Sequence, residues 1–170
     1  MNPLPKLAMV IFALTACLSI ARPVSALTVS RDQWDQAGSA CQLVAPTTSS
    51  KVRQQAAGMR NEGTTNEFVI CQFTSTSPLE WATINFQSLD GVDHVVNCTG
   101  MVGTTLGFVA YSSKSAAMGP DWWPGEIVWM PADFGESGDF GSALFSVTCL
   151  LPAGTQLVTL GSGYAEDVGS

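Results

Sequence analysis

Basic residues are scarce in this sequence, and histidine is nearly absent. The 170 residues include seven Lys and Arg against fourteen Asp and Glu, with one His and a formal net charge of −7. From Asn61 onward, twelve acidic residues accompany a single basic one, Lys114. Because phosphate binding depends on clustered Lys and Arg, this composition excludes nucleic acid and anionic lipid as expected partners. Net negative charge of this kind is typical of a soluble surface.

The sequence also lacks an apolar run long enough to span a membrane. The longest run, Leu7 to Ile20, has fourteen residues, whereas a transmembrane helix needs about 20. We therefore predict no transmembrane segment. The run follows Lys6 and precedes the small residues Val24-Ser25-Ala26, a pattern typical of a secretory signal peptide. We expect residues 1–26 to be removed after Ala26, which leaves 27–170 as one secreted domain, periplasmic or extracellular.

A bacterial lipoprotein is the alternative reading of the N-terminus. Leu14-Thr15-Ala16-Cys17 also matches a lipobox, in which Cys17 would become the lipidated first residue. The residues after Cys17 stay apolar, however, where lipoproteins usually carry a polar tether. We therefore favour cleavage after Ala26.

Cysteine is sparse: the sequence has five, and four of them lie beyond residue 26. In an exported chain these thiols are expected to be oxidised into two disulfides. Cys98 and Cys149 each lie in the middle of a predicted strand with apolar residues two positions away, so both should face the core. This geometry favours pairing Cys98 with Cys149, which leaves Cys41 to pair with Cys71.

No long helical period is visible, and alternation with period two dominates between Cys41 and Tyr164. In 80–89, for example, Ala82, Ile84 and Phe86 share one face. The same pattern predicts strands at 41–45, 66–74, 80–89, 92–102, 105–113, 126–131, 141–151 and 155–163. We therefore predict an all-β fold, an antiparallel β-sandwich of about seven to eight strands.

Two local signals refine this prediction. Asp90-Gly91 lies between two strands and favours a type I′ turn that would join 80–89 to 92–102. Ser30 followed by Gln33 resembles a capping box, which predicts a short helix over 31–37. Residues 46–66 and 114–125 are rich in loop formers.

A recurring cysteine layout suggests a family. The segments concerned are Ser39-Ala40-Cys41-Gln42, Gly58-Met59-Arg60-Asn61, Phe68-Val69-Ile70-Cys71, Val96-Asn97-Cys98, Phe145 to Pro152, and Ser162-Gly163-Tyr164. This layout resembles a group of uncharacterised, four-cysteine secreted proteins of bacteria. The resemblance implies export, a bacterial origin and β-architecture, but it transfers no functional residue.

No complete catalytic set is visible. Gly135-Glu136-Ser137-Gly138-Asp139 is similar to the nucleophile context of chymotrypsin-like proteases, but such a serine needs a histidine base. The only histidine, His94, should share a strand face with Val96 and Cys98, as a structural residue would. We therefore expect no enzyme. A hydrolase built on Ser137, or on an acid pair such as Asp90 and Asp93, is the second alternative.

Asp133, Glu136 and Asp139 recur every three residues in a glycine-rich loop. Oxygen ligands on such a loop suit Ca²⁺, so these three are the candidate metal ligands. Their spacing does not match an EF-hand, and acidic turns are often only solvated.

Trp122 and Trp123 lie between Pro120 and Pro124 in a loop. In extended backbone the two indoles cannot point to the same side, so at least one should reach solvent or cap a sheet edge. An exposed indole can stack on a sugar ring, which makes Trp122 and Trp123 the candidate ligand-binding residues. We therefore expect an exported, non-catalytic protein with a binding or surface-structural role, and a carbohydrate-binding module as the alternative. Its partner would be a glycan or a protein of the cell envelope.

Overall fold

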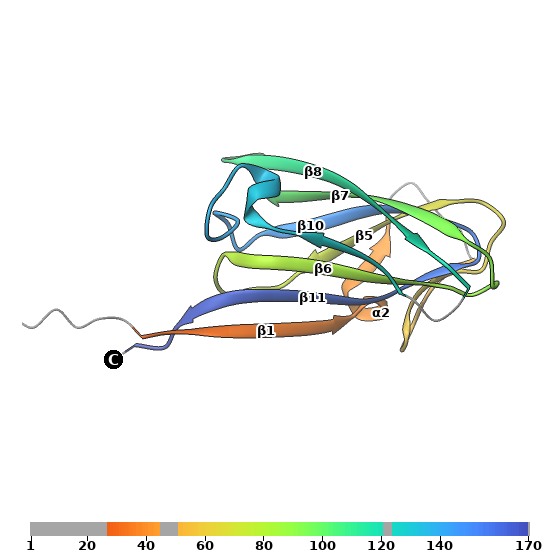
Figure 1. Ribbon diagram of the computed structural model, residues 1–170, viewed down its shortest axis with the longest axis horizontal. Coiled ribbons are helices and arrows are strands. Elements are labelled where there is room, and N and C mark those ends of the chain that lie inside the picture. The colour runs from red at the N-terminus through yellow and green to blue at the C-terminus, as the bar shows by residue number, and fades with distance from the viewer. Residues whose placement is uncertain (1–26, 45–50, 121–123, 170) are drawn as a thin grey trace, which may run out of the picture. The chain divides into compact units, whose positions relative to one another are not determined.

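The computed structural model describes residues 27–44, 51–120 and 124–169. Within these residues, eleven strands form two antiparallel sheets that pack face to face (Figure 1). The predicted all-β sandwich is therefore confirmed, although it contains three more strands than the upper predicted number. Residues 29–166 make up one unit. The described parts of a second unit, 27–28 and 167–169, carry their own backbone hydrogen bonds, such as Val168 N to Leu27 O at 3.0 Å.

The larger sheet has six strands in the order β3-β4-β11-β6-β9, and β1 also pairs with β11. Its strands are β1 (Thr28–Gln36), β3 (Val52–Gln55), β4 (Gly58–Asn61), β6 (Leu79–Ser88), β9 (Gly125–Trp129) and β11 (Thr155–Asp167). The long strand β11 therefore holds this sheet together, since it contacts β1, β4 and β6.

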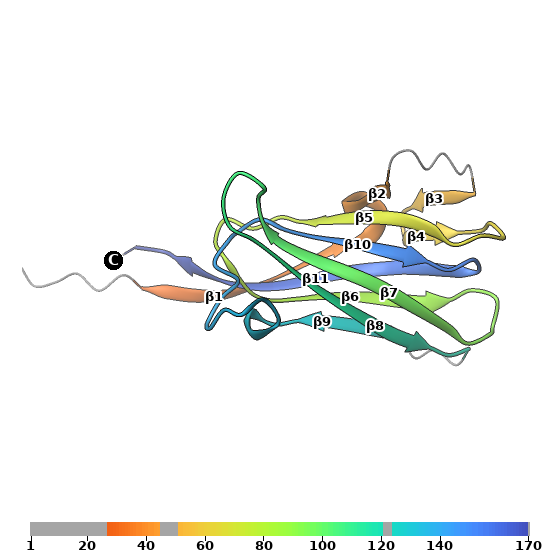
Figure 2. The ribbon, with the colours of Figure 1, turned by 90° about the horizontal axis from the view of Figure 1, so that it is seen from above.

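The smaller sheet has five strands in the order β2-β5-β10-β7-β8, and its outer face is toward the viewer in Figure 2. Its strands are β2 (Cys41–Leu43), β5 (Glu67–Phe73), β7 (His94–Gly103), β8 (Val109–Met118) and β10 (Phe145–Leu151). Two short helices complete the described structure, α2 (Ala37–Ala40) and the 3-10 helix η1 (Pro131–Phe134). No helix in the described ranges is long and apolar enough to cross a membrane.

The core lies between the sheets and follows the predicted alternation. Ala82, Ile84 and Phe86 of β6 are fully buried, as predicted for this strand. Phe145 of β10 is the centre of an aromatic cluster, with ring centroids 5.0 Å from Phe73 and 5.9 Å from Trp129. Each such side chain contributes about 1.5–3 kcal/mol through burial.

Both predicted disulfides are confirmed. Cys41 pairs with Cys71 between β2 and β5, and Cys98 pairs with Cys149 between β7 and β10. Each pair joins residues directly opposite one another in the strand register. All four cysteines are buried on the inner face of the five-stranded sheet, so both disulfides brace this one sheet.

The predicted helix over 31–37 is wrong, because residues 31–36 belong to the edge strand β1 and only Ala37 lies in a helix, α2. The Gln33 side chain does not cap a helix but donates to Thr74 Oγ1 at 2.8 Å. Trp34 lies against Gly161 of β11. These contacts with distant residues override a weak local helix signal.

The predicted hairpin at Asp90-Gly91 is also wrong. Strands β6 and β7, which this turn connects, belong to different sheets. Residues 89–93 therefore cross the end of the sandwich, with Gly91 at φ 75° and the Asp90 carboxylate accepting the Val92 amide at 3.2 Å. The dipeptide indicated a turn but not which strands it joins.

Sequence patterning also missed the hairpin β3–β4, which lies within the segment read as loop. In addition, β8 begins at Val109 rather than at 105, because residues 104–108 form the tip of the β7–β8 hairpin. The remaining predicted strands lie where the alternation placed them, within a few residues at each end.

Candidate functional site

Trp122 and Trp123, the sequence-predicted ligand-binding residues, lie outside the described residues. The structure does describe the two flanking strands, β8 ending at Met118 and β9 beginning at Gly125.

The predicted calcium ligands are not brought together. Asp133 lies in η1, where its Oδ2 accepts from Lys114 Nζ at 2.6 Å and from the Met130 amide at 2.7 Å. Asp139 Oδ1 accepts the Gly141 amide at 2.7 Å, as in a solvated turn. Across the described ranges, no three His, Cys, Asp or Glu side chains lie close enough to hold a metal ion. Asp133 and Asp139 thus accept hydrogen bonds from nearby backbone amides, and Asp133 also from Lys114.

The charges around Asp133 have a clear effect on its titration. Burial alone would raise the pKa of Asp133, but the hydrogen bonds from Lys114 and the Met130 amide, with the Lys114 charge, leave that pKa below its ordinary value. Lys114 Nζ also donates to the Val128 carbonyl at 2.7 Å. Lys114 on β8 thus ties the edge of one sheet to β9 of the other.

The structure places His94 at the start of β7, with its Nε2 2.8 Å from Asp90 Oδ1. This hydrogen bond is the main cause that lowers the pKa of Asp90. Ser137 lies in the loop after η1 with an exposed side chain. The imidazole of His94 thus lies within hydrogen-bond distance of Asp90, a partner that the sequence pattern did not indicate.

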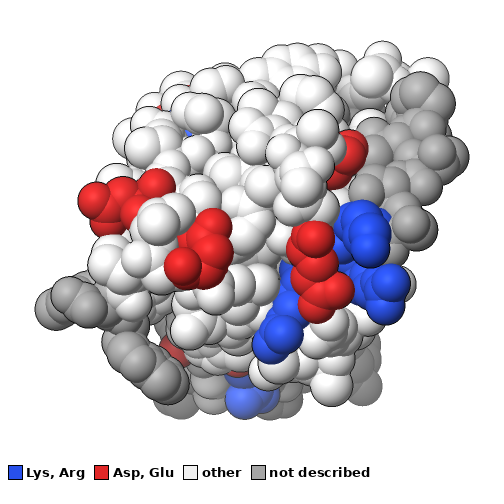
Figure 3. Space-filling view, turned by 90° about the vertical axis from the view of Figure 1, so that its right-hand side faces the viewer, with Lys and Arg blue, Asp and Glu red and all other residues white. Residues whose placement is uncertain are grey.

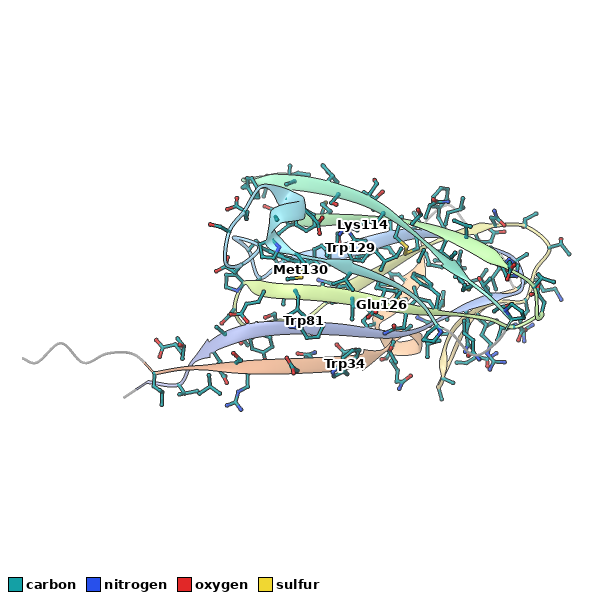
Figure 4. The ribbon with its side chains drawn as sticks, in the orientation of Figure 1. Trp34, Trp81, Lys114, Glu126, Trp129 and Met130 are labelled. Carbon is teal, nitrogen blue, oxygen red and sulfur yellow. A yellow bond between two sulfur atoms is a disulfide. The ribbon has the colours of Figure 1, made fainter. Side chains whose placement is uncertain are left out.

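The outer face of the six-stranded sheet carries a pair of indoles that the sequence did not single out. Trp34 extends from β1 and Trp81 from β6, and their ring centroids are 6.0 Å apart at an interplanar angle of 53° (Figure 4). Trp34 is 58% exposed although it is a large apolar side chain. We refer to Trp34 and Trp81 as the indole pair.

Two glycines of β11 make room for the indole pair. A Cβ atom on Gly161 would lie 2.6 Å from Cζ3 of Trp34, and one on Gly163 would lie 2.0 Å from Nε1 of Trp81. Strand β11 runs between β1 and β6, so the indoles lean over it from opposite sides and meet above it. Glycine in a strand interior weakens the strand, and it often marks such a close approach.

A carboxylate lies next to the indole pair. Thr83 follows Trp81 by two residues on β6 and therefore lies on the same face, about 7 Å further along. Its hydroxyl is 2.9 Å from Oε1 of Glu126 on β9, while Thr83 itself is only 2% exposed. Glu126 is thus held in place with a second carboxylate oxygen left to accept from a ligand hydroxyl. Figure 4 shows Glu126 on the neighbouring strand.

Amide and hydroxyl groups continue this face beyond the carboxylate. A hollow of about 380 Å³ is lined by Asn85, Gln87, Thr159, Val158 and Pro124. Asn85 Nδ2 donates to Thr159 Oγ1 at 3.2 Å across β6 and β11. The face therefore offers stacking surfaces at one end and hydrogen-bonding groups along the rest.

Basic side chains are concentrated elsewhere. Of the described Lys and Arg residues, Lys51, Arg53 and Arg60 lie on or beside the β3–β4 hairpin. Figure 3 shows Lys and Arg side chains gathered on one side of the face that it views, with carboxylates beside them. The indole pair and Glu126 thus form a site that is apolar and acidic, which suits an uncharged, hydroxyl-rich ligand.

Sequence reasoning missed the indole pair for identifiable reasons. Trp34 fell in a segment read as helix, and Trp81 in a strand read only for its buried face. The usable signal was Gly161-Ser162-Gly163, two glycines spaced by one residue inside a predicted strand, which indicates that large side chains cover one face.

No protein-family model and no curated protein matches this sequence. Among solved structures, the fold is similar to a family two carbohydrate esterase from Cellvibrio japonicus, with a TM-score of 0.50 and 12% sequence identity. That match takes in 81% of this chain but 35% of the esterase, so this chain spans about a third of its length.

Two smaller proteins also match. One is the CBM36-1 domain of a multidomain xylanase from the hindgut metagenome of Trinervitermes trinervoides, with a TM-score of 0.42, 12% identity, and coverage of 78% of this chain and 96% of that domain. The other is CBM35 from Cellvibrio japonicus Abf62, with a TM-score of 0.39, 11% identity, and coverage of 86% and 99%. At 12% identity, the match to the esterase shows the β-sandwich fold alone.

Proposed function

We propose that this protein is an exported, non-catalytic carbohydrate-binding protein, and that an uncharged sugar chain stacks on the indole pair. The observation that carries the proposal is the exposed Trp34 beside Trp81, both held over the two glycines of β11. The apolar C–H face of a pyranose packs well against an indole ring, whose contribution exceeds simple area burial.

The groups around the indole pair support the same ligand class. Glu126 accepts hydrogen bonds, and Asn85 and Gln87 both donate and accept them, as sugar hydroxyls require. The 53° angle between the two rings gives two faces of different direction rather than one flat plane. Such an arrangement suits a single twisted chain better than the surface of a crystalline polymer.

The test measures binding of the full secreted chain to soluble β-glucan, arabinoxylan and galactomannan by affinity electrophoresis. Trp34→Ala and Trp81→Ala should each weaken retention at least about tenfold, which corresponds to about 1.4 kcal/mol. Leu106→Ala is the matched control, because Leu106 is 99% exposed at a hairpin tip distant in sequence. Circular dichroism must show that each variant keeps its β-fold.

Two results would overturn the proposal. One is a wild-type protein that binds none of the polysaccharides, and the other is retention unchanged in both tryptophan variants.

The sequence-based hypothesis for Trp122 and Trp123 can be tested in the same experiment. Pro124, the residue after Trp123, lines the hollow next to Glu126. If this loop contributes to binding, Trp122→Ala or Trp123→Ala should weaken retention in addition to the effect of the indole pair. Retention equal to wild type in both variants would remove the loop from the site.

A further inference from the structure

The outer face of the five-stranded sheet, on the opposite side of the sandwich, carries a groove of its own. It has a volume of about 630 Å³ and crosses β5, β10, β7 and β8, the strands that face the viewer in Figure 2. Its floor is a row of residues in register, Ile70, Thr148, Thr99 and Ser113. The Thr99 and Ser113 hydroxyls are hydrogen-bonded at 2.8 Å, so the floor is ordered and bears hydroxyl groups.

Two exposed aromatic side chains stand at opposite corners of this groove. Phe68 on β5 is 50% exposed and Tyr111 on β8 is 61% exposed. Three strand spacings separate β5 from β8, and Ser115, in the row of Phe68, lies four residues from Tyr111. The Cα atoms of Phe68 and Tyr111 are therefore about 20 Å apart, from about 14 Å across the strands and about 13 Å along them. That separation matches a short oligosaccharide rather than a single sugar.

The groove has a single charged residue in its lining, although the protein is acidic. Lys114 is the one charged residue in its lining, and its ammonium group is bound to Asp133 and to the Val128 carbonyl of β9. The lining thus mixes hydroxyls with apolar side chains such as Met101 and Leu150, has aromatic ends, and holds one charge that is already paired. Such a lining favours a neutral chain with both hydroxyls and apolar ring faces over a charged polymer or a peptide with ionic side chains.

The groove also continues sideways. A second hollow of about 420 Å³ shares Ile70 and Ser146 with it and reaches Gln42 and Gln54. The Gln54 amide is itself hydrogen-bonded to the Cys41 carbonyl. Together the two hollows cross the sheet from β8 to β2, which favours an elongated occupant.

We propose that this groove is a second binding site for a neutral oligosaccharide, with Phe68 and Tyr111 as its stacking residues. This inference rests on the proposed function of the indole pair, because it assigns the same ligand class to the opposite face. The two sheets pack about 10 Å apart, so two sites on their outer faces cannot be occupied by one straight chain. The protein then links two polysaccharide chains.

The test combines stoichiometry with cross-linking. Isothermal titration with hexasaccharides of glucose, xylose and mannose should give a stoichiometry near two for wild type and near one for the variant Phe68→Ala/Tyr111→Ala. The variant Trp34→Ala/Trp81→Ala should also give about one. Wild type should raise the light scattering of the soluble polysaccharide, whereas each double variant should not.

The outcomes separate the two proposals. If Phe68→Ala/Tyr111→Ala keeps wild-type stoichiometry and scattering while Trp34→Ala/Trp81→Ala loses binding, the groove inference is overturned and the proposed function stands. If Trp34→Ala/Trp81→Ala is unchanged, the proposed function fails instead. A third result would also overturn the inference: wild type binds an array of unstructured peptides, and Phe68→Ala/Tyr111→Ala loses this peptide binding but keeps its sugar binding.

Two single substitutions of Tyr111 control for the possibility that the double variant misfolds. Tyr111→Phe keeps the ring and should retain at least half of the wild-type affinity, whereas Tyr111→Ser should weaken hexasaccharide binding about tenfold. If Tyr111→Phe and Tyr111→Ser lose the same amount of affinity, the contact is made by the phenol hydroxyl, and stacking on the ring is overturned.

Discussion

Asn61 is a buried side chain that satisfies three backbone groups at once. Its Nδ2 donates to the carbonyls of Thr65 and Leu151 at 2.9 and 3.0 Å, and its Oδ1 accepts the Gly63 amide at 3.0 Å. It is fully buried at the end of β4. This one side chain thus fixes how β4 leaves the sheet and meets the end of β10.

We expect Asn61→Ala to lower the free energy of unfolding by about 2–4 kcal/mol, because the Leu151 carbonyl would lose a buried donor and the Thr65 carbonyl a partly buried one. Urea denaturation followed by circular dichroism measures this. Asn66→Ala is the control, since Asn66 makes one exposed contact to the Ala153 amide at 3.4 Å and should cost less than about 1 kcal/mol. If Asn61→Ala and Asn66→Ala lower the free energy of unfolding equally, the proposed role of the Asn61 side chain is wrong.

The pair of Asp133 and Lys114 predicts a dependence of stability on pH. Because the pKa of Asp133 is lowered in the folded state, its contribution to stability is present above the unfolded pKa, near 3.8, and is lost as pH falls through the lower folded pKa. We expect Asp133→Asn to reduce stability by about 1–2 kcal/mol at pH 7, after allowance for solvent screening.

Thermal unfolding of the wild type and of Asp133→Asn from pH 7 to pH 2 tests this expectation. The difference between their melting temperatures should shrink below about pH 4. Glu136→Gln removes one charge from the same loop and is the control. Its melting temperature should stay close to that of the wild type from pH 7 to pH 2. A constant difference between wild type and Asp133→Asn at all pH values would argue against a titrating contribution.

At the scale of elements, strand β11 sets the position of the indole pair. Its two glycines leave space that any larger residue would fill with a Cβ atom. Since the colliding atoms belong to the indole side chains and not to backbone, substitution should move the indoles outward rather than break the sheet.

We therefore expect Gly161→Ala and Gly163→Ala to keep the β-fold, to shift tryptophan fluorescence to longer wavelength, and to weaken polysaccharide retention about tenfold. Gly107→Ala is the matched control, because a Cβ atom there meets nothing within 4 Å. Retention at the wild-type level in both β11 variants would show that the exact placement of the indoles is unimportant.

Elements with strict alternation could be predicted from the sequence, and those held by distant partners could not. Strands β6 and β10 bury one face continuously, so period two marks them clearly. The edge strand β1 has a largely exposed pattern and gains its conformation from β11 and Thr74. Contacts with residues this distant in the chain cannot be predicted from the local sequence pattern.

The candidate site shows the same division. Disulfide partners could be predicted, because strand faces determine which cysteines are buried. The indole pair could not, because Trp34 and Trp81 are far apart in sequence and meet only above Gly161 and Gly163. Trp122 and Trp123, which the sequence favoured, remain a prediction.

At the scale of the whole molecule, two buried disulfides accord with an oxidising compartment. We predict that the exported protein begins at Leu27 after cleavage behind Ala26. Intact mass spectrometry of the protein from the periplasm and the culture medium measures this. A lipid-modified species that begins at Cys17 would contradict the prediction and would place the protein on a membrane surface.

Strand β11 has a consequence for how this chain folds. It follows every other described strand in sequence, yet it lies inside the six-stranded sheet, between β6 on one side and β1 and β4 on the other. The edges of β4 and β6 that face β11 therefore stay open until β11 arrives, although β4 also pairs with β3 and β6 with β9. Contacts this distant in sequence form slowly. We therefore expect the six-stranded sheet to close only after β11 has joined it, which is compatible with the export of an extended polypeptide.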